Sequence, residues 1–326
     1  MTQSQMVVFN QYFMPAIIET LAQDIDKFNA ASAGAIVLSP AGFDGDFFQE
    51  SFWKAIHTAQ RRVDRYAAQT AATATDLQQG SIATVKVAGG FGPIRFEPAQ
   101  MTWLNKPTAE GIEVASRNFA EALLQDQINT AIAALVAAIG NNAAMVNDVS
   151  ATGVLTYRAL NGAHAKFGDR SADIIANVMT GAAYHSLIDQ NLANGQHLFQ
   201  AGGVTVVDIL NKRVVITDAP ALSVAAVGGD TPVPAKTRAL GLVSGAATVS
   251  NAGDVITNIE TKNGQTRIET TLQSDYAFGL GIKGYTWDTT NGGKSPTDAE
   301  LATGSNWDKV ATSDKHTAGV LAVGQA

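Results

Sequence analysis

The chain has 326 residues, no cysteine and a formal net charge of −7. The absence of cysteine excludes disulfide and thiolate chemistry, and the length suffices for two domains or one elaborate domain. Hydrophobic residues make up 46% of the sequence, so a packed core can form. Charged residues make up only 16%, below the roughly 25% of typical soluble domains. This deficit fits a surface covered by other subunits, and equally a chain that is simply rich in alanine and glycine.

The charge pattern gives no electrostatic footprint of a dedicated nucleic-acid binder, because no Lys/Arg block exists beyond Arg61, Arg62 and Arg65. The N-terminal residues lack the basic region and apolar core of a secretory signal. The longest apolar run, residues 131–139, falls short of the roughly 20 residues that cross a bilayer. We therefore expect neither a membrane partner nor sequence-specific binding of nucleic acid.

Residues 1–50 have the pattern of an arm with little core of its own. Apolar residues at helical spacing predict an early helix: Tyr12, Phe13, Ala16, Ile17, Leu21 and Ile25. Residues 39–42 predict a turn, and the segment after it contains three phenylalanines without a clear period: Phe43, Phe47 and Phe48. These aromatic side chains need a surface that the arm does not provide.

Residues 51–105 are predicted to form an extended loop. A helix is expected over 52–66, and the alternation over 81–87 predicts a strand. The glycines and proline of 89–93 predict a turn, after which 94–97 would return as the second strand of a hairpin-like extension. A two-stranded ribbon is marginal in water on its own, so we expect this extension to be ordered only against another surface.

A single long helix, from residue 108 to about 139, is the dominant predicted element. Pro107 and Thr108 supply a start signal, and Gly140 followed by two asparagines supplies a stop. One apolar stripe runs between these signals: Ile112, Ala115, Phe119, Leu123, Ile128, Ile132, Leu135 and Ile139. At ~1.5 Å per residue the rod is roughly 45 Å long, which suits a backbone on which other parts are mounted.

The remainder predicts a second helix and then mostly strands. The helix is expected over 171–194, strands over 203–210 and 213–217, a loop over 219–236 and one buried strand over 239–249. Asn263 and Gly264 are the preferred pair for a tight hairpin turn. Pairing outward from them sets three matched pairs opposite one another: Glu260 with Arg267, Ile259 with Ile268, and Val255 with Leu272. Strand character continues through 276–287.

No candidate motif assembles a catalytic or metal-binding site. The glycines at Gly279, Gly281 and Gly284 have the G-x-G-x-x-G spacing, but strand-like residues follow them where a dinucleotide site needs a helix, so close strand crossing is the better explanation. Asp44, Gly45, Asp46 and Glu50 lack the spacing of a calcium loop.

The histidines and the one serine motif are equally unpromising. Five histidines have no metal-ligand spacing: His57, His164, His185, His197 and His316. We expect His185 to be a satisfied core residue of its helix. Ser244, within residues 241–245, is one position away from that of a nucleophile elbow. We predict no catalytic, cofactor-binding or metal-binding residue, and hence no enzyme.

The order of parts (arm, two-stranded extension, long helix, α/β region and β-rich return) resembles the major capsid proteins of tailed bacteriophages, with the α+β Hong Kong 97-like fold. Four stretches strengthen the resemblance: 213–222 (RVVITDAPAL), 276–285 (YAFGLGIKGY), 295–301 (SPTDAEL), and Asn306 with Trp307. The motifs cover about a third of the chain and the order of parts nearly all of it.

The resemblance implies a division of the chain and a function. It assigns 1–50 to an N-terminal arm, 51–105 to the extended loop, 106–160 to a peripheral domain with a spine helix, 161–245 to an axial domain, and 246–326 to a β-rich return to the peripheral domain. Members of the family build icosahedral heads from hexamers and pentamers around a DNA genome. Some carry an N-terminal scaffolding segment, so an arm-like start implies a separate scaffold or a segment already removed.

The implied partners are sister copies, a scaffolding protein, a portal and a cement protein, and the implied place is the virion after assembly in the host cytoplasm. Some members form Lys–Asn crosslinks; Lys86 lies in the expected loop, but no motif establishes crosslinking and none is predicted. We also hypothesise that the acidic balance keeps the inner wall from holding packaged DNA. Two alternatives stay open: an encapsulin-type bacterial compartment shell, and a nucleotide-binding enzyme using 279–284.

Overall fold

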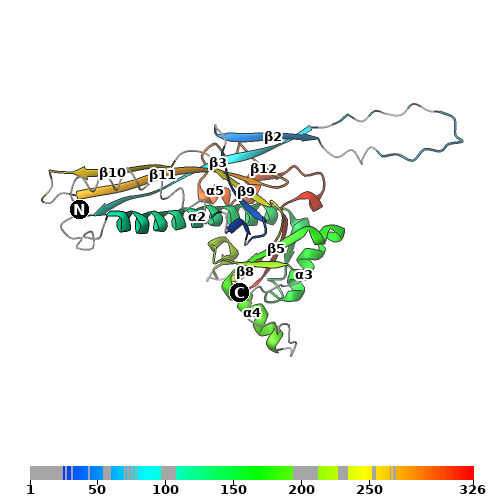
Figure 1. Cartoon of the computed structure of the whole chain (residues 1–326). Coiled ribbons are helices and arrows are strands. Elements are labelled where there is room, and N and C mark those ends of the chain that lie inside the picture. Colours follow the sequence, from blue (N-terminus) through cyan, green and yellow to red (C-terminus); the bar gives the residue numbers. More distant parts are fainter. Residues whose placement is uncertain are drawn as a thin grey trace, which may run out of the picture.

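The computed structural model describes residues 25, 28–30, 32–42, 45–53, 60–69, 71, 74, 76–77, 79–96, 108–193, 212–226, 234–251, 255–264, 266 and 269–326. These residues form a long sheet with one long helix beside it, and a second sheet with two shorter helices at one end of that helix (Figure 1). The expected helix over 12–25 and the expected strand over 203–210 lie almost entirely outside the described residues.

The first sheet has six strands in the order β1-β9-β11-β3-β2, with β10 also paired to β11. Their bounds are β1 Ile36–Gly42, β2 Phe47–Trp53, β3 Gln79–Phe96, β9 Ala247–Asn251, β10 Ile256–Lys262 and β11 Glu269–Ile282. Only β1 and β9 run parallel; the other pairs are antiparallel. The sheet therefore joins strands from the first hundred residues with strands that follow residue 246.

The long helix α2, Thr108–Asn141, has 34 residues and confirms the predicted spine. Its C-terminal half is almost entirely buried: Ala131, Ile132, Ala134, Leu135, Ala138 and Ile139 are inaccessible to solvent. The stretch Ser116–Asn141 is long and apolar enough to cross a membrane by length and hydropathy alone, but 56% of its apolar window is buried in the fold. Burial against both sheets accounts for this apolar character without a bilayer.

The second sheet has the order β4-β14-β8-β5-β6, with β7 paired to β8. Its strands are β4 Val146–Asp148, β5 Ile174–Met179, β6 Arg213–Ile216, β7 Ser223–Val224, β8 Lys236–Val243 and β14 Gly319–Gln325. Helices α3, Tyr157–Ala165, and α4, Gly181–Ala193, pack beside it. The last strand, β14, thus lies in this sheet and not with the other strands that follow residue 246.

A small two-stranded sheet of β12, Tyr285–Trp287, and β13, Trp307–Lys309, lies next to α2 and β3. The two tryptophans pack edge to face with ring centroids 4.9 Å apart. Between these strands, α5, Asp298–Leu301, begins with a capping box in which Thr297 and Glu300 satisfy each other's backbone N–H groups. The local motif of 295–301 therefore has a definite role in starting a helix turn.

Three helix and strand predictions were wrong. The first part of the expected helix over 171–194 is a short 3-10 helix, η4 Gly168–Asp173, followed by strand β5, and α4 begins only at Gly181. A strand buried on both faces has no alternation, so its apolar run imitates a helix. The expected strand over 239–249 is divided between β8 and β9, which lie in different sheets. The expected loop over 219–236 contains a 3-10 turn, Pro220–Leu222, and β7.

The extension also differs from its prediction. No helix covers 52–66 within the described residues: Phe52 and Trp53 pair with β3, and 60–69 has no regular structure. The expected turn over 39–42 is the bulged end of β1. β3 runs on as one 18-residue strand through Gly89 to Phe96, with a register shift beside the cis Gly92–Pro93 peptide, instead of folding into a hairpin. The real hairpin is made by β2 and β3.

The β10–β11 hairpin exists, but its register was predicted wrongly. Ile259 lies opposite Leu272 and Lys262 lies opposite Glu269, so the partners are shifted by four residues and the connection is longer than a two-residue turn. The opposite edge of β11 explains the shift, because Leu272 also pairs with Ile94 of β3. The third strand, β3, therefore decides the register, and the turn residues alone predicted a different one.

Candidate assembly surfaces

The glycines of the G-x-G-x-x-G spacing lie in a strand and its turn, and no helix follows them. Gly279 pairs with both Lys86 and Ser250 within the first sheet. A Cβ atom on Gly281 would lie 2.8 Å from the Thr84 hydroxyl oxygen. Gly284 has φ +80° at the turn into β12. This geometry accounts for the glycines by the close approach of a neighbouring strand and by a turn. It argues against the nucleotide-binding alternative, because strand β12 stands where that site needs a helix.

The weak metal and nucleophile candidates are not brought together. Within the described part of the chain, no group of three or more His, Asp or Glu side chains could hold a metal ion. Asp46 forms an ion pair with Lys294 at 3.4 Å, and Asp44 lies outside the described residues. Ser244 directly follows β8, and its carbonyl accepts a hydrogen bond from Lys283 at 3.0 Å.

The histidine prediction identified the wrong residue as the core histidine. His185 is exposed on α4, whereas His164 is buried on α3. The His164 Nε2 atom lies 2.8 Å from Oδ1 of buried Asn177 on β5. Burial lowers the pKa of His164, so its ring is held neutral. His316 is exposed, while His57 and His197 lie outside the described residues.

The hairpin of β2 and β3 carries the chain far beyond the rest of the molecule (Figure 1). All described residues over 60–69 are exposed. Val63 retains 68% and Tyr66 91% of their accessible surface, and the Arg65 guanidinium lies over the Tyr66 ring at 5.9 Å. Leu77, nearer β3, is 55% exposed. We call β2, β3 and the described residues between them the extension.

The extension is unsuited to an isolated molecule. Its apolar and aromatic side chains are exposed to water, and burying them would be favourable. Aromatic residues and arginine are also enriched in protein interfaces. The base of the extension is well held, because Ala83 N donates to the Thr286 hydroxyl at 2.8 Å. A firmly anchored base with an unburied tip presents a surface for another molecule.

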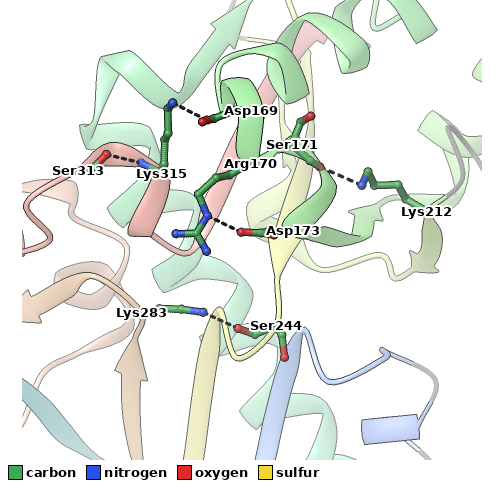
Figure 2. A network of polar contacts seen from close by, with 9 residues as sticks. All are labelled: Asp169, Arg170, Ser171, Asp173, Lys212, Ser244, Lys283, Ser313 and Lys315. Carbon is green, nitrogen blue, oxygen red and sulfur yellow. Dashed lines mark hydrogen bonds and ion pairs between the residues drawn. The ribbon is translucent and has the colours of Figure 1, made fainter.

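The two sheets meet at a polar junction that the sequence did not reveal (Figure 2). Gly245 N donates to Gly34 O at 2.8 Å where β8 gives way to β9, and Gly245 has φ +64°. Lys315 bonds to Asp169, and Arg170 Nε bonds to Asp173 at 2.6 Å. The contacts of Gly245 and Lys315 join segments more than 100 residues apart, so no local pattern could have predicted them.

A second long-range contact fixes the spine helix to the first sheet. Tyr276 Oη on β11 donates to Asp126 Oδ2 on α2 at 2.6 Å. Burial raises the pKa of Asp126 and also that of Tyr276, whose proton is further retained by the carboxylate beside it. Gly89 on β3 leaves room for the tyrosine ring, because a Cβ there would lie 2.7 Å from it.

Comparisons with known proteins agree with this architecture. A family model described as "Major capsid protein 13-like" (Gp13-like) matches residues 5–321. A search of curated proteins found no match. The capsid asymmetric unit of cyanophage Pam1 is similar in structure, with a TM-score of 0.51, 12% identity, and coverage of 86% of this chain and 85% of that one.

Two further structures are similar at lower scores. Microbacterium phage Oxtober96 has a TM-score of 0.48 and 13% identity, with 90% of each chain covered. The SrpI encapsulin of Synechococcus elongatus PCC 7942 has a TM-score of 0.45 and 8% identity, with 87% of this chain and 83% of that one covered. The fold is α+β and Hong Kong 97-like. Because the family model spans nearly the whole chain, this protein belongs to the Gp13-like family of phage major capsid proteins.

Proposed function

We propose that copies of this chain assemble into hexamers and pentamers of an icosahedral phage head, and that the extension of each copy is buried on its neighbours. The observation that carries this proposal is the exposed tip at 60–69 with its apolar residues Val63 and Tyr66. Each contact can be weak, because closing a ring makes the later contacts intramolecular and raises their effective concentration.

The proposed division of labour follows the two sheets. The first sheet with α2 would form the peripheral domain and the second sheet the axial domain near the capsomer centre, with residues 1–50 as the arm and 51–105 as the extended loop. Residues 161–245 would form the axial domain together with β4 and β14, because β14 pairs with β4 and with β8 in the second sheet. The role of the chain is structural and non-enzymatic.

The other partners are proposed on the resemblance alone. They are a separate scaffolding protein, a portal and a cement protein, and assembly would take place in the host cytoplasm before the subunit becomes part of the virion. Co-purification of heads from infected cells, followed by mass spectrometry, tests each partner separately.

Limited proteolysis tests the burial of the extension. Arg61, Arg62 and Arg65 are exposed in the subunit, so trypsin should cut there in unassembled protein and not in assembled particles, which are followed by light scattering and negative-stain microscopy. Equal cleavage in both states would contradict the proposal. Particles that contain protein cargo in place of nucleic acid would favour the encapsulin alternative.

Paired variants test whether the tip drives assembly. Val63→Asp with Tyr66→Asp should abolish particles while leaving the melting temperature of the subunit unchanged, because both side chains are already solvated there. The matched control, Val63→Ile with Tyr66→Phe, keeps the apolar surface and should assemble. Normal particles from the double aspartate variant would refute the proposed role of the tip.

A further inference from the structure

Five cations gather at the junction of the two sheets although the chain is acidic overall. Arg170, Lys212, Lys283 and Lys315 surround η4 and the end of β8 (Figure 2), and Arg213 follows directly after Lys212. We call these five residues the junction cluster. They come from four separate stretches of the chain, so no basic run marks them in the sequence.

Most of these cations are held by neutral groups. Lys212 Nζ donates to Ser171 O at 3.0 Å and also to the Ile174 carbonyl. Lys283 Nζ donates to Ser244 O at 3.0 Å, and Arg213 Nη1 donates to Ala30 O at 2.8 Å. A carbonyl oxygen fixes the position of an ammonium or guanidinium group but does not cancel its charge.

Only two carboxylates face the junction cluster among the described residues that bond to it. Asp169 accepts from Lys315, and Asp173 accepts from Arg170. Burial lowers the pKa of Lys212, and the charge of Asp173 opposes this effect only in part. The junction cluster therefore has five positive charges against two negative ones, with Arg170, Arg213 and Lys283 exposed, and it is a local positive field on a chain of net charge −7.

The chemistry of the cluster favours a polyanion over a protein partner. The core of a protein interface is apolar. Of the eight large hydrophobic residues that are exposed in the described part of the chain, six belong to the extension and the first sheet: Phe48, Val63, Tyr66, Leu77, Ile94 and Ile256. Cations pre-positioned by backbone carbonyls lose little side-chain entropy on binding. A nucleic-acid backbone offers a phosphate charge every ~1.7 Å of duplex, which matches several fixed cations without any sequence recognition.

We propose that the junction cluster contacts the phosphate backbone of the enclosed genome, and that this side of the junction faces the interior of the shell. This inference rests on the proposed function, since it requires a closed shell around DNA. It also reverses the expectation that an acidic chain has an inner wall without basic contacts. The contact that one subunit makes with the phosphate backbone is weak, and the contacts of the many subunits in a shell add together.

The test compares two double variants that remove the same charge. Arg170→Gln with Lys283→Gln removes exposed members of the junction cluster, whereas Lys262→Gln with Lys294→Gln removes two exposed lysines elsewhere. Binding of each purified protein to a fluorescein-labelled duplex of random sequence, about 24 base pairs long, is measured by anisotropy over a range of salt concentrations. Circular dichroism and thermal melting verify that both variants fold.

We expect the junction variant to bind more weakly, and its slope of log K against log salt to become less negative by about 0.9 for each phosphate that the protein no longer neutralises. The control variant should keep the slope of the parent. Equal slopes for the parent and the junction variant would overturn the proposal. So would poly-glutamate that displaces the duplex at a lower charge concentration than unlabelled duplex does, which would indicate an acidic protein partner. Particle formation is scored separately by microscopy. Failure of the parent protein to form shells refutes the proposed function. Normal shells of the parent, with the same salt slope in the parent and the junction variant, refute only this inference.

Discussion

Removing one hydroxyl group should loosen the spine helix from the first sheet. Tyr276→Phe keeps the ring, which packs against Phe91 with centroids 5.4 Å apart, and deletes the donor to Asp126 at 2.6 Å. A hydrogen bond to a charged group contributes roughly 1.5–3 kcal/mol. Asp126 is only partly buried, so water can replace part of the bond. We therefore expect a loss of about 1–2 kcal/mol in the free energy of unfolding at neutral pH.

The cost should depend on pH, with a sign that the structure fixes. Burial raises the pKa of Asp126, and the tyrosine hydroxyl partly offsets this by lowering it, so the variant has a still higher pKa at Asp126. As the pH falls, the carboxyl group therefore takes up a proton in the folded variant before it does so in the folded parent. The folded variant gains stability from this earlier protonation, and the difference between the two proteins should shrink.

The assay is urea unfolding of the unassembled subunit, followed by tryptophan fluorescence at neutral pH and at intervals down to about pH 4, the ordinary range of a carboxyl group. Tyr66→Phe is the matched control, because Tyr66 is 91% exposed and its hydroxyl should contribute nothing. A Tyr276→Phe variant as stable as its parent at neutral pH would refute the reasoning, as would a cost that stays constant across the acid range.

Three further predictions concern the core. Gly319→Ala should cost about 3 kcal/mol or prevent folding, because φ is +151° and a Cβ would lie 2.0 Å from the Gly241 carbonyl oxygen; Gly153→Ala, with open space around it, should change the melting temperature little. Burial lowers the pKa of His164 in the folded state, so the free energy of unfolding should fall as the pH drops below about 6.5, the pKa in the unfolded state. In His164→Gln the slope of the free energy of unfolding against pH should be smaller, by the equivalent of at most about one bound proton; an unchanged slope would contradict this. Leu135→Ala should cost about 2–5 kcal/mol in urea unfolding, since Leu135 is inaccessible; a loss below that range would mean the site collapses around the smaller side chain.

Much of the fold is predictable from local signals in the sequence. The spine helix is found because a start signal, one apolar stripe and a glycine near its end agree over more than thirty residues. The strand of 81–87 and the strands through 276–287 are found from alternation and aromatic content. The glycines at Gly279 and Gly281 are correctly assigned to strands that approach closely and not to a nucleotide site, because the residues after them continue as strand.

The errors arise where a local pattern permits two structures. The apolar run of β5 satisfies a helical period as well as a buried strand, and only its neighbours β6 and β8 decide for the strand. The turn at Asn263 and Gly264 favours a tight hairpin, but pairing of β11 with β3 shifts the register. The aromatic residues after Glu50 were assigned to a helix, and their partners on β3 make them a strand.

The sequence by itself determined the spine helix, the strands of strong alternation and the presence of segments too poor in core to fold alone, because each of these depends on residues close together in the chain. Only the tertiary structure decided which strands share a sheet, which histidine is buried, and how Arg170, Lys212, Lys283 and Lys315 come to lie together. Hydrogen bonding between strands and burial of charge depend on contacts between distant segments, and those contacts exist only after the chain has folded.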